Sequence, residues 1–115
     1  MPLTHRTAGD GVLVIRLLPA LALRHRAAAT LAIDELLASH RPRRLVVEIP
    51  SLLTPAATSV VLRAQHSCRA RAASLAVVST AVEVRRLLRQ SLAAGGLTVY
   101  ASVTQAVHAV EVLPS

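Results

Sequence analysis

The hydrophobic positions of this chain form two patterns that alternate along its length. Runs of consecutive apolar residues are typical of strands that are covered on both faces. Such runs stand at residues 12–17, 45–49, 74–79 and 97–100. A weaker run at residues 3–8 predicts a short edge strand, which a Gly9-Asp10-Gly11 turn joins to the first of these runs.

Between these runs the apolar residues return with a helical period. Helices are predicted after Pro19 as far as residues 39–40, where Pro42 prevents continuation, and then over residues 57–72, 81–92 and 103–110. In the first helix, one face is expected to turn inward with a set of small and aliphatic residues, namely Leu23, Ala27, Thr30, Leu31, Ala32, Leu36 and Leu37.

Local signals mark the ends of the last two helices. Thr80 and Glu83 have the spacing of a capping box at the start of the helix over residues 81–92. The glycines at 95 and 96 can end that helix in the left-handed conformation, and Ser102 is placed to cap the last helix.

Regular alternation of strands and helices with short connections predicts an α/β fold. We expect a single domain over residues 1–115 with its core over residues 12–110. The central sheet should have four to five strands, mostly parallel, with right-handed crossovers and about four helices.

The segment from Arg44 to Ala64 is the most informative part of the chain. A strand stops at Pro50, a loop of Pro, Ser and Thr follows over residues 50–55, and a helix is expected to begin near Ala56 or Ala57. The unpaired N–H groups of that helix start would lie at the sheet edge, which suits an anion or a partner protein. No carboxylate stands there.

Composition narrows the function classes. The chain is 53% hydrophobic but has one Tyr and neither Phe nor Trp, so RNA-binding surfaces that stack bases on aromatic rings are not expected. All thirteen basic residues are Arg, against six acidic ones, giving a net charge of +7. Arg bias in the genome and a basic face for an acidic partner both account for this, and the arginines are scattered along the chain.

The compartment is predicted from Cys usage and hydropathy. Cys68 is the single cysteine, so it forms no internal disulfide and is expected to be a buried filler. The N-terminus lacks the apolar region of a signal peptide, and the apolar runs are too short to span a bilayer. A reducing cytoplasm is the expected location.

Residues that could carry catalysis are few. The five histidines have no metal-ligand spacing, and neither a nucleotide-binding motif nor a Ser-His-Asp arrangement is present. Glu48 in a buried strand is interpreted as one half of a structural ion pair with an arginine such as Arg16, in preference to a general base. We therefore expect no enzyme activity, metal or cofactor.

The order of elements resembles the STAS domain of bacterial anti-sigma factor antagonists, without gaps over residues 12–110. The matching stretches are RLLPALAL from residue 16, IDELLA from 33, EIPSL from 48, AATSV from 56, SLAVVS from 74, VRRLL from 84 and VYAS from 99. The resemblance depends on their joint order, with VRRLL and VYAS as its landmarks.

The resemblance implies a regulatory role. Such proteins bind an anti-sigma factor, often a serine kinase, and thereby free a sigma factor; the kinase switches them off by phosphorylating the first Ser of an Asp-Ser-Ser-Gly-Leu motif. Here Ala57 occupies that position, Ala56 replaces the preceding Asp, and Ala22 replaces another family Asp. Thr58 stands at the second Ser position, as either a displaced phosphoacceptor or, the reading we favour, the N-cap of the helix.

The first hypothesis is a STAS module that is not switched by phosphorylation at residue 57. It would dock an anti-sigma factor, an ATPase-type serine/threonine kinase among the candidates, with an acidic surface as the better match. The alternative is a STAS module that binds a small anionic or lipid ligand, with Thr54, Thr58 and Ser59 donating to an anion, or that serves a transporter complex. A third hypothesis, nucleic-acid binding, rests only on the excess of arginine, and a homodimer stays open. The expected partner-binding residues are Ser51, Thr54, Ala56, Ala57, Thr58, Ser59, Leu62 and Arg63.

Overall fold

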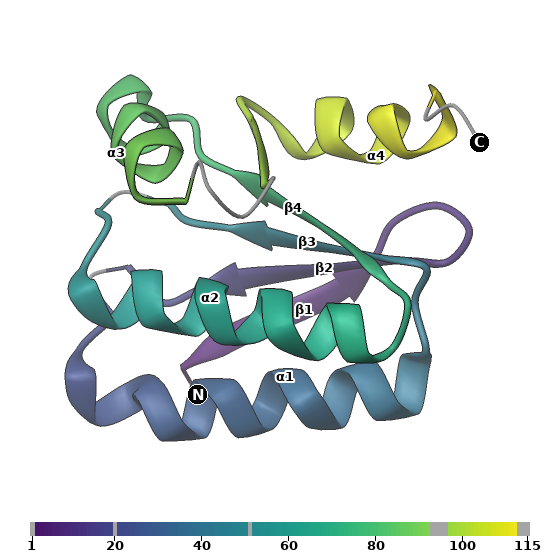
Figure 1. The fold of residues 1–115 in the computed structure, drawn as a ribbon, viewed down its shortest axis with the longest axis horizontal. Coiled ribbons are helices and arrows are strands. Elements are labelled where there is room, and N and C mark those ends of the chain that lie inside the picture. The colour runs from purple at the N-terminus through teal and green to yellow at the C-terminus, as the bar shows by residue number, and fades with distance from the viewer. Residues whose placement is uncertain (1, 20, 51, 93–96, 113–115) are drawn as a thin grey trace.

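The computed structural model describes residues 2–19, 21–50, 52–92 and 97–112 (Figure 1). Each predicted strand and helix is present there, with ends that differ from the prediction by a few residues. The strands are β1 (Leu3–Thr7), β2 (Val12–Leu17), β3 (Arg44–Glu48), β4 (Ser74–Val78) and β5 (Thr98–Tyr100). The helices are α1 (Arg26–His40), preceded by a 3₁₀ turn η1 (Leu23–His25), α2 (Pro55–Ala70), α3 (Val82–Leu92) and α4 (Val103–Val112).

The five strands form one sheet in the order β1-β2-β3-β4-β5. β1 is antiparallel to β2, and every later pair is parallel, so the predicted mostly parallel α/β sheet is confirmed. We call the edge where β2 to β5 begin the amino end of the sheet, and the edge where they end the carboxyl end. Both α1 and α2 start at the carboxyl end and run back toward the amino end (Figure 1).

The core lies on both faces of the sheet. One face, with Leu13, Ile15, Leu45 and Val47, packs against α1 and α2, which lie side by side (Figure 1). The opposite face packs against α4 through Ala106. Because each parallel strand is covered on both sides, its sequence is a continuous apolar run instead of an alternating one.

The inward face of α1 differs from the expected one. Ala29, Ile33 and Leu37 are its buried residues, whereas Leu31 is 60% exposed, and Leu23 and Ala27 are exposed as well. The placement of Leu23, Ala27 and Leu31 in the core was therefore wrong. The exposed leucine matters for the site described below.

Helix ends also refine the prediction. Ser102 caps α4, since its Oγ accepts a hydrogen bond from the Gln105 N–H at 3.2 Å. The capping box at α3 was wrong: the helix begins one residue later than Thr80 would require, and the Arg85 N–H bonds the Ala81 carbonyl at 3.1 Å. Glu83 pairs instead with Arg86. The glycines at 95 and 96 lie outside the described residues.

The β1–β2 turn is tied to the start of β3. Gly9 and Gly11 have φ of 67° and 73°, values at which any side chain would be strained. The Gly11 carbonyl accepts from the Arg43 N–H at 2.8 Å, and a Cβ at Gly11 would lie 3.1 Å from the Arg43 side chain. Glycine is therefore required at this amino-end turn for both its conformation and its close approach.

Candidate functional site

The candidate site lies at the carboxyl end of the sheet, where the chain passes from β3 into α2. The Ile49 N–H bonds the Val78 carbonyl at 2.8 Å, which holds the chain beside β4 after β3 has ended. The Thr54 hydroxyl then donates to the Leu21 carbonyl at 2.6 Å, a contact between segments 33 residues apart. The start of α2 is thus fixed to both the sheet and the segment that leads into α1.

Thr54 is the N-cap of α2, and Pro55 is its first residue. The Thr54 Oγ1 accepts from the Ala57 N–H at 3.0 Å, which satisfies one of the free donors of the first turn. Proline at the first position is preorganised for the helix and has no N–H to leave unpaired. The prediction that Thr58 is the N-cap was wrong, because the helix begins three residues before it.

Thr58 lies in the first turn of α2. Its N–H bonds the Thr54 carbonyl at 3.0 Å, and its hydroxyl donates to that same carbonyl at 3.2 Å. The small-anion alternative requires the hydroxyls of Thr54 and Thr58 to donate outward to the ligand. Both hydroxyls instead donate to backbone carbonyls of the protein. Phosphorylation of Thr58 would first have to break its bond.

Ala56 and Ala57 face the core. They are 2% and 1% exposed and pack in the cluster beneath α1 and α2. Their side chains therefore cannot touch a partner directly, in contrast to the expectation for the docking face. Ser51 falls outside the described residues.

The outward side of α2 carries the other predicted residues. Leu62 is 48% exposed, Arg63 is exposed, and Ser59 is partly exposed. Ser59 and Arg63 line one wall of an open groove of about 400 Å³ between α2 and α1, and the exposed Leu31 lines the other wall. The structure thus brings Ser59 and Arg63 together with a residue that the helical pattern had assigned to the core.

Sequence reasoning missed the α1 side of this groove. Arg26, Leu31 and Asp34 line it, and the Asp34 carboxylate accepts from the Ser67 hydroxyl of α2 at 2.7 Å. One signal was available: Leu31 stands two residues before the buried Ile33, and residues two apart do not share a helix face.

Glu48 ends β3 beside this site. Its carboxylate lies 3.6 Å from the Arg16 guanidinium of β2, so the predicted structural ion pair is confirmed. The two residues are partners in the parallel register of β2 and β3, which explains a contact across 32 positions of sequence. The second carboxylate oxygen is buried without a hydrogen-bond partner in the described part of the chain.

Chemistry beyond binding finds little support among the described residues. They contain no group of three or more potential metal ligands. Burial raises the pKa of the Cys68 thiol to about 11, with nearby Arg71 opposing this, so the thiol stays protonated and unreactive. No helix in the described ranges is long and apolar enough to cross a membrane.

Comparisons of the whole fold define its class. A scan against protein-family models and a search of curated proteins both find no match. Among solved structures, the anti-sigma factor antagonist SpoIIAA in its unphosphorylated form is similar with a TM-score of 0.75 at 15% identity, covering 98% of this chain and 99% of that one.

Two further solved structures agree with SpoIIAA. An anti-sigma factor antagonist from Mycobacterium paratuberculosis has a TM-score of 0.76 at 19% identity, over 95% of this chain and 94% of that one. A candidate anti-sigma factor antagonist from Thermotoga maritima has a TM-score of 0.74 at 13% identity, over the same shares, 95% and 94%. The mixed sheet with four helices is thus similar in fold to all three structures. It is the STAS fold of SpoIIAA.

Proposed function

We propose that this protein binds an anti-sigma factor and thereby releases a sigma factor. The observation that carries the proposal is the fold likeness to three anti-sigma factor antagonists, each over at least 95% of this chain. The start of α2, where the resemblance puts the family's switch, is a capped helix end bonded to the Leu21 carbonyl, beside an open groove. Such a platform suits recognition of a folded partner, because little ordering is needed on binding.

The docking face that we propose consists of Thr58, Ser59, Leu62 and Arg63 on α2 together with Leu31 on α1. Ser51 and the loop before α2 border it in sequence. The two leucines supply apolar surface, and Arg26 and Arg63 outnumber the one carboxylate of the groove, Asp34, which already accepts from Ser67. A partner that presents an apolar side chain ringed by carboxylates would match both features.

In this proposal Ala56 and Ala57 support the face from beneath. Alanine at residue 57 has no hydroxyl, and its side chain is packed inward. A phosphate of about −1.5 to −2 charge therefore cannot be attached there to repel the partner. We infer that binding is constitutive, whether the partner is an ATPase-type serine/threonine kinase or another anti-sigma factor.

The direct test uses the purified protein and the anti-sigma factors encoded in the same genome. Calorimetry should find one that binds, and transcription assays should show that binding frees its sigma factor. Leu62→Asp should weaken binding about tenfold or more, since it puts a charge in the centre of the face. Val82→Asp is the matched control, because Val82 is also an exposed aliphatic residue but lies on α3. Equal losses in both variants, or no binding by any candidate, would overturn the proposal.

A second experiment tests constitutive binding. Incubation with the partner kinase and Mg-ATP should give no phosphorylated protein and no loss of affinity. A phosphorylated band that disappears in Thr58→Ala would assign Thr58 as the displaced acceptor and refute constitutive binding. Thr30→Ala, in the facing wall of the groove, controls for loss of an unrelated hydroxyl.

A further inference from the structure

Arg44 is the first residue of β3, at the amino end of the sheet and far along the strand from the start of α2. Its side chain is only 4% exposed. Two of its three guanidinium nitrogens, Nε and Nη1, are buried and have no hydrogen-bond partner in the described part of the chain. The ion pairs found there join Arg16 to Glu48 and Arg86 to Glu83, so Arg44 is not neutralised by a carboxylate.

This arrangement is costly for the isolated protein. Arginine stays protonated at physiological pH, so burial cannot be relieved by loss of the proton. An unpaired buried charge destabilises a fold far more than an apolar side chain of similar length would. The two nitrogens are also closed off from solvent, so bulk water does not replace the missing acceptors. An acceptor supplied by a ligand would remove the penalty.

A hollow of about 230 Å³ lies against Arg44. Its wall includes the hydroxyl residues Ser74, at the start of β4, and Thr98, at the start of β5. Arg69 of α2 also lines it, and the described residues of the wall include no carboxylate. The Ser74 hydroxyl already donates to the Arg43 carbonyl, so the Arg44 guanidinium and the Thr98 hydroxyl are the donors that suit a phosphate group, with Arg69 as a nearby positive charge.

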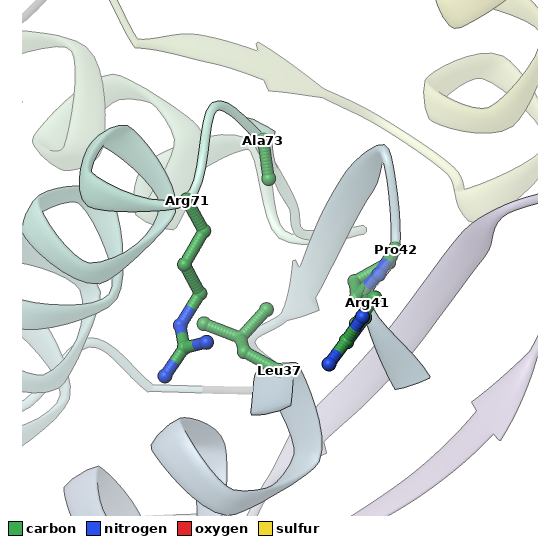
Figure 2. A pocket seen from close by; sticks show the side chains of 5 residues that line it. All are labelled: Leu37, Arg41, Pro42, Arg71 and Ala73. Carbon is green, nitrogen blue, oxygen red and sulfur yellow. The ribbon is translucent and has the colours of Figure 1, made fainter. Parts of the chain in front are cut away.

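The surroundings add positive charge. A neighbouring hollow of about 320 Å³ shares Ala73 with the first and is lined by Arg41 and Arg71. Figure 2 shows these two arginines on either side of Leu37. Arg43, whose Nε donates to the Asp10 carbonyl, lies at the same end. Although the acidic Asp10 stands in the β1–β2 turn, the arginines outnumber it at this end, and such an excess of positive charge attracts anions and raises their local concentration.

We propose that the Arg44 hollow is a phosphate-binding site, which takes inorganic phosphate or the phosphate group of a small metabolite. Arg44 is the anchor of the anion and Thr98 donates from the start of β5, while the Ser74 hydroxyl stays bonded to the Arg43 carbonyl and Arg69 adds positive charge to the wall. The site is separate from the docking face at the carboxyl end. Its failure would leave the proposed binding of an anti-sigma factor untouched.

Thermal melting at constant ionic strength tests the site. Inorganic phosphate should raise the melting temperature of the wild-type protein, by roughly 10 °C at a hundredfold excess over the dissociation constant. Arg44→Met should lose this response, and Arg6→Met, which removes an exposed arginine of β1, should keep it. The same experiment with glycerol 3-phosphate distinguishes a metabolite from the free ion, because the compound that binds more tightly is the better match to the site.

Thr98→Val covers the case in which Arg44→Met does not fold. It changes an exposed rim residue and should weaken phosphate binding by about threefold to tenfold, measured by calorimetry. No response of the wild type to either phosphate compound would overturn the proposal. So would a response as large in Arg44→Met as in the wild type, or an equal response to acetate, which would indicate general charge screening.

Discussion

The two ends of the sheet differ in how far their polar side chains are paired within the protein. At the carboxyl end, the hydroxyls of Thr54 and Thr58 bond backbone carbonyls and Glu48 pairs with Arg16. At the amino end, Arg44 is buried with two nitrogens that have no acceptor in the described part of the chain. One Glu48 oxygen also lacks a hydrogen-bond partner in the described part of the chain, but its carboxylate is paired with Arg16, whereas Arg44 belongs to none of the ion pairs found there.

This difference bears on what each end can bind. A region whose hydrogen bonds are satisfied internally recognises a partner by shape, apolar contact and charge at its surface, with little rearrangement. A buried cation without an acceptor gains most from a small anion that enters the protein. The predictions below test whether the two ends really differ in this way, beginning with the largest expected effect.

The closed packing of the carboxyl end is tested by Ala57→Asp. Because residue 57 is buried, the new carboxylate would have to be desolvated, and the free energy of unfolding should fall by roughly 3 kcal/mol. Urea unfolding followed by circular dichroism measures this. Ser59→Asp places the same charge two residues on at a partly exposed position of the same helix and should be nearly neutral. Similar losses in both variants would show that Ala57 is not enclosed.

Thr54→Val tests the link between α2 and the segment before α1. It removes the cap of α2 and leaves the Leu21 carbonyl without its donor, so we expect a loss of about 2 kcal/mol in the free energy of unfolding. Thr58→Val removes one hydroxyl whose acceptor is bonded already, and it should cost less than half as much. A larger loss at Thr58 would reverse the assignment of the N-cap.

In phosphate-free buffer, Arg44→Met should change the free energy of unfolding in the opposite direction to the two variants above. Replacing an unpaired buried guanidinium by an apolar chain of similar length should raise the free energy of unfolding by about 1 kcal/mol. Arg16→Met serves as the comparison, because it strands Glu48 and should lower stability. If both variants are destabilised alike, the two ends of the sheet do not differ as described.

Cys68, which lines the Arg44 hollow, gives an effect that appears only at alkaline pH. Its pKa of about 11 in the folded state lies above the ordinary value of 9.0 because burial disfavours the thiolate. The unfolded chain therefore loses this proton first, and stability that is complete below pH 9 is lost as the pH rises through about 11. The urea midpoint should decline over this interval, and Cys68→Ala should remove that part of the decline.

The sequence predicted the strands best, because parallel strands covered on both faces leave unbroken apolar runs such as residues 12–17. The Glu48–Arg16 pair was also foreseen, since a charge within such a run needs a partner. Helix faces were less certain: α1 is rich in Ala and Leu all round, so its period does not distinguish the buried Ile33 from the exposed Leu31.

The N-cap and Arg44 depended on tertiary structure. Thr54 and Thr58 both have the chemistry of a cap, and the contact of Thr54 with Leu21 favours the earlier one. An arginine that starts a strand would be exposed in an isolated hairpin. Here Gly11 binds the Arg43 and Arg44 N–H groups, at 2.8 and 3.3 Å, and holds this residue against its neighbours in the sheet. No local pattern of residues carries that information.

The sequential strand order has a consequence for how the chain is made. Each strand pairs with the one that immediately precedes it in sequence, so no strand waits for a later segment to be inserted beside it. During synthesis on the ribosome, every strand that emerges finds its neighbour already present, and the open edges are those of β1 and of the newest strand. The sheet can therefore grow in the direction of translation, and each parallel pair forms once the crossover that carries a helix has been made.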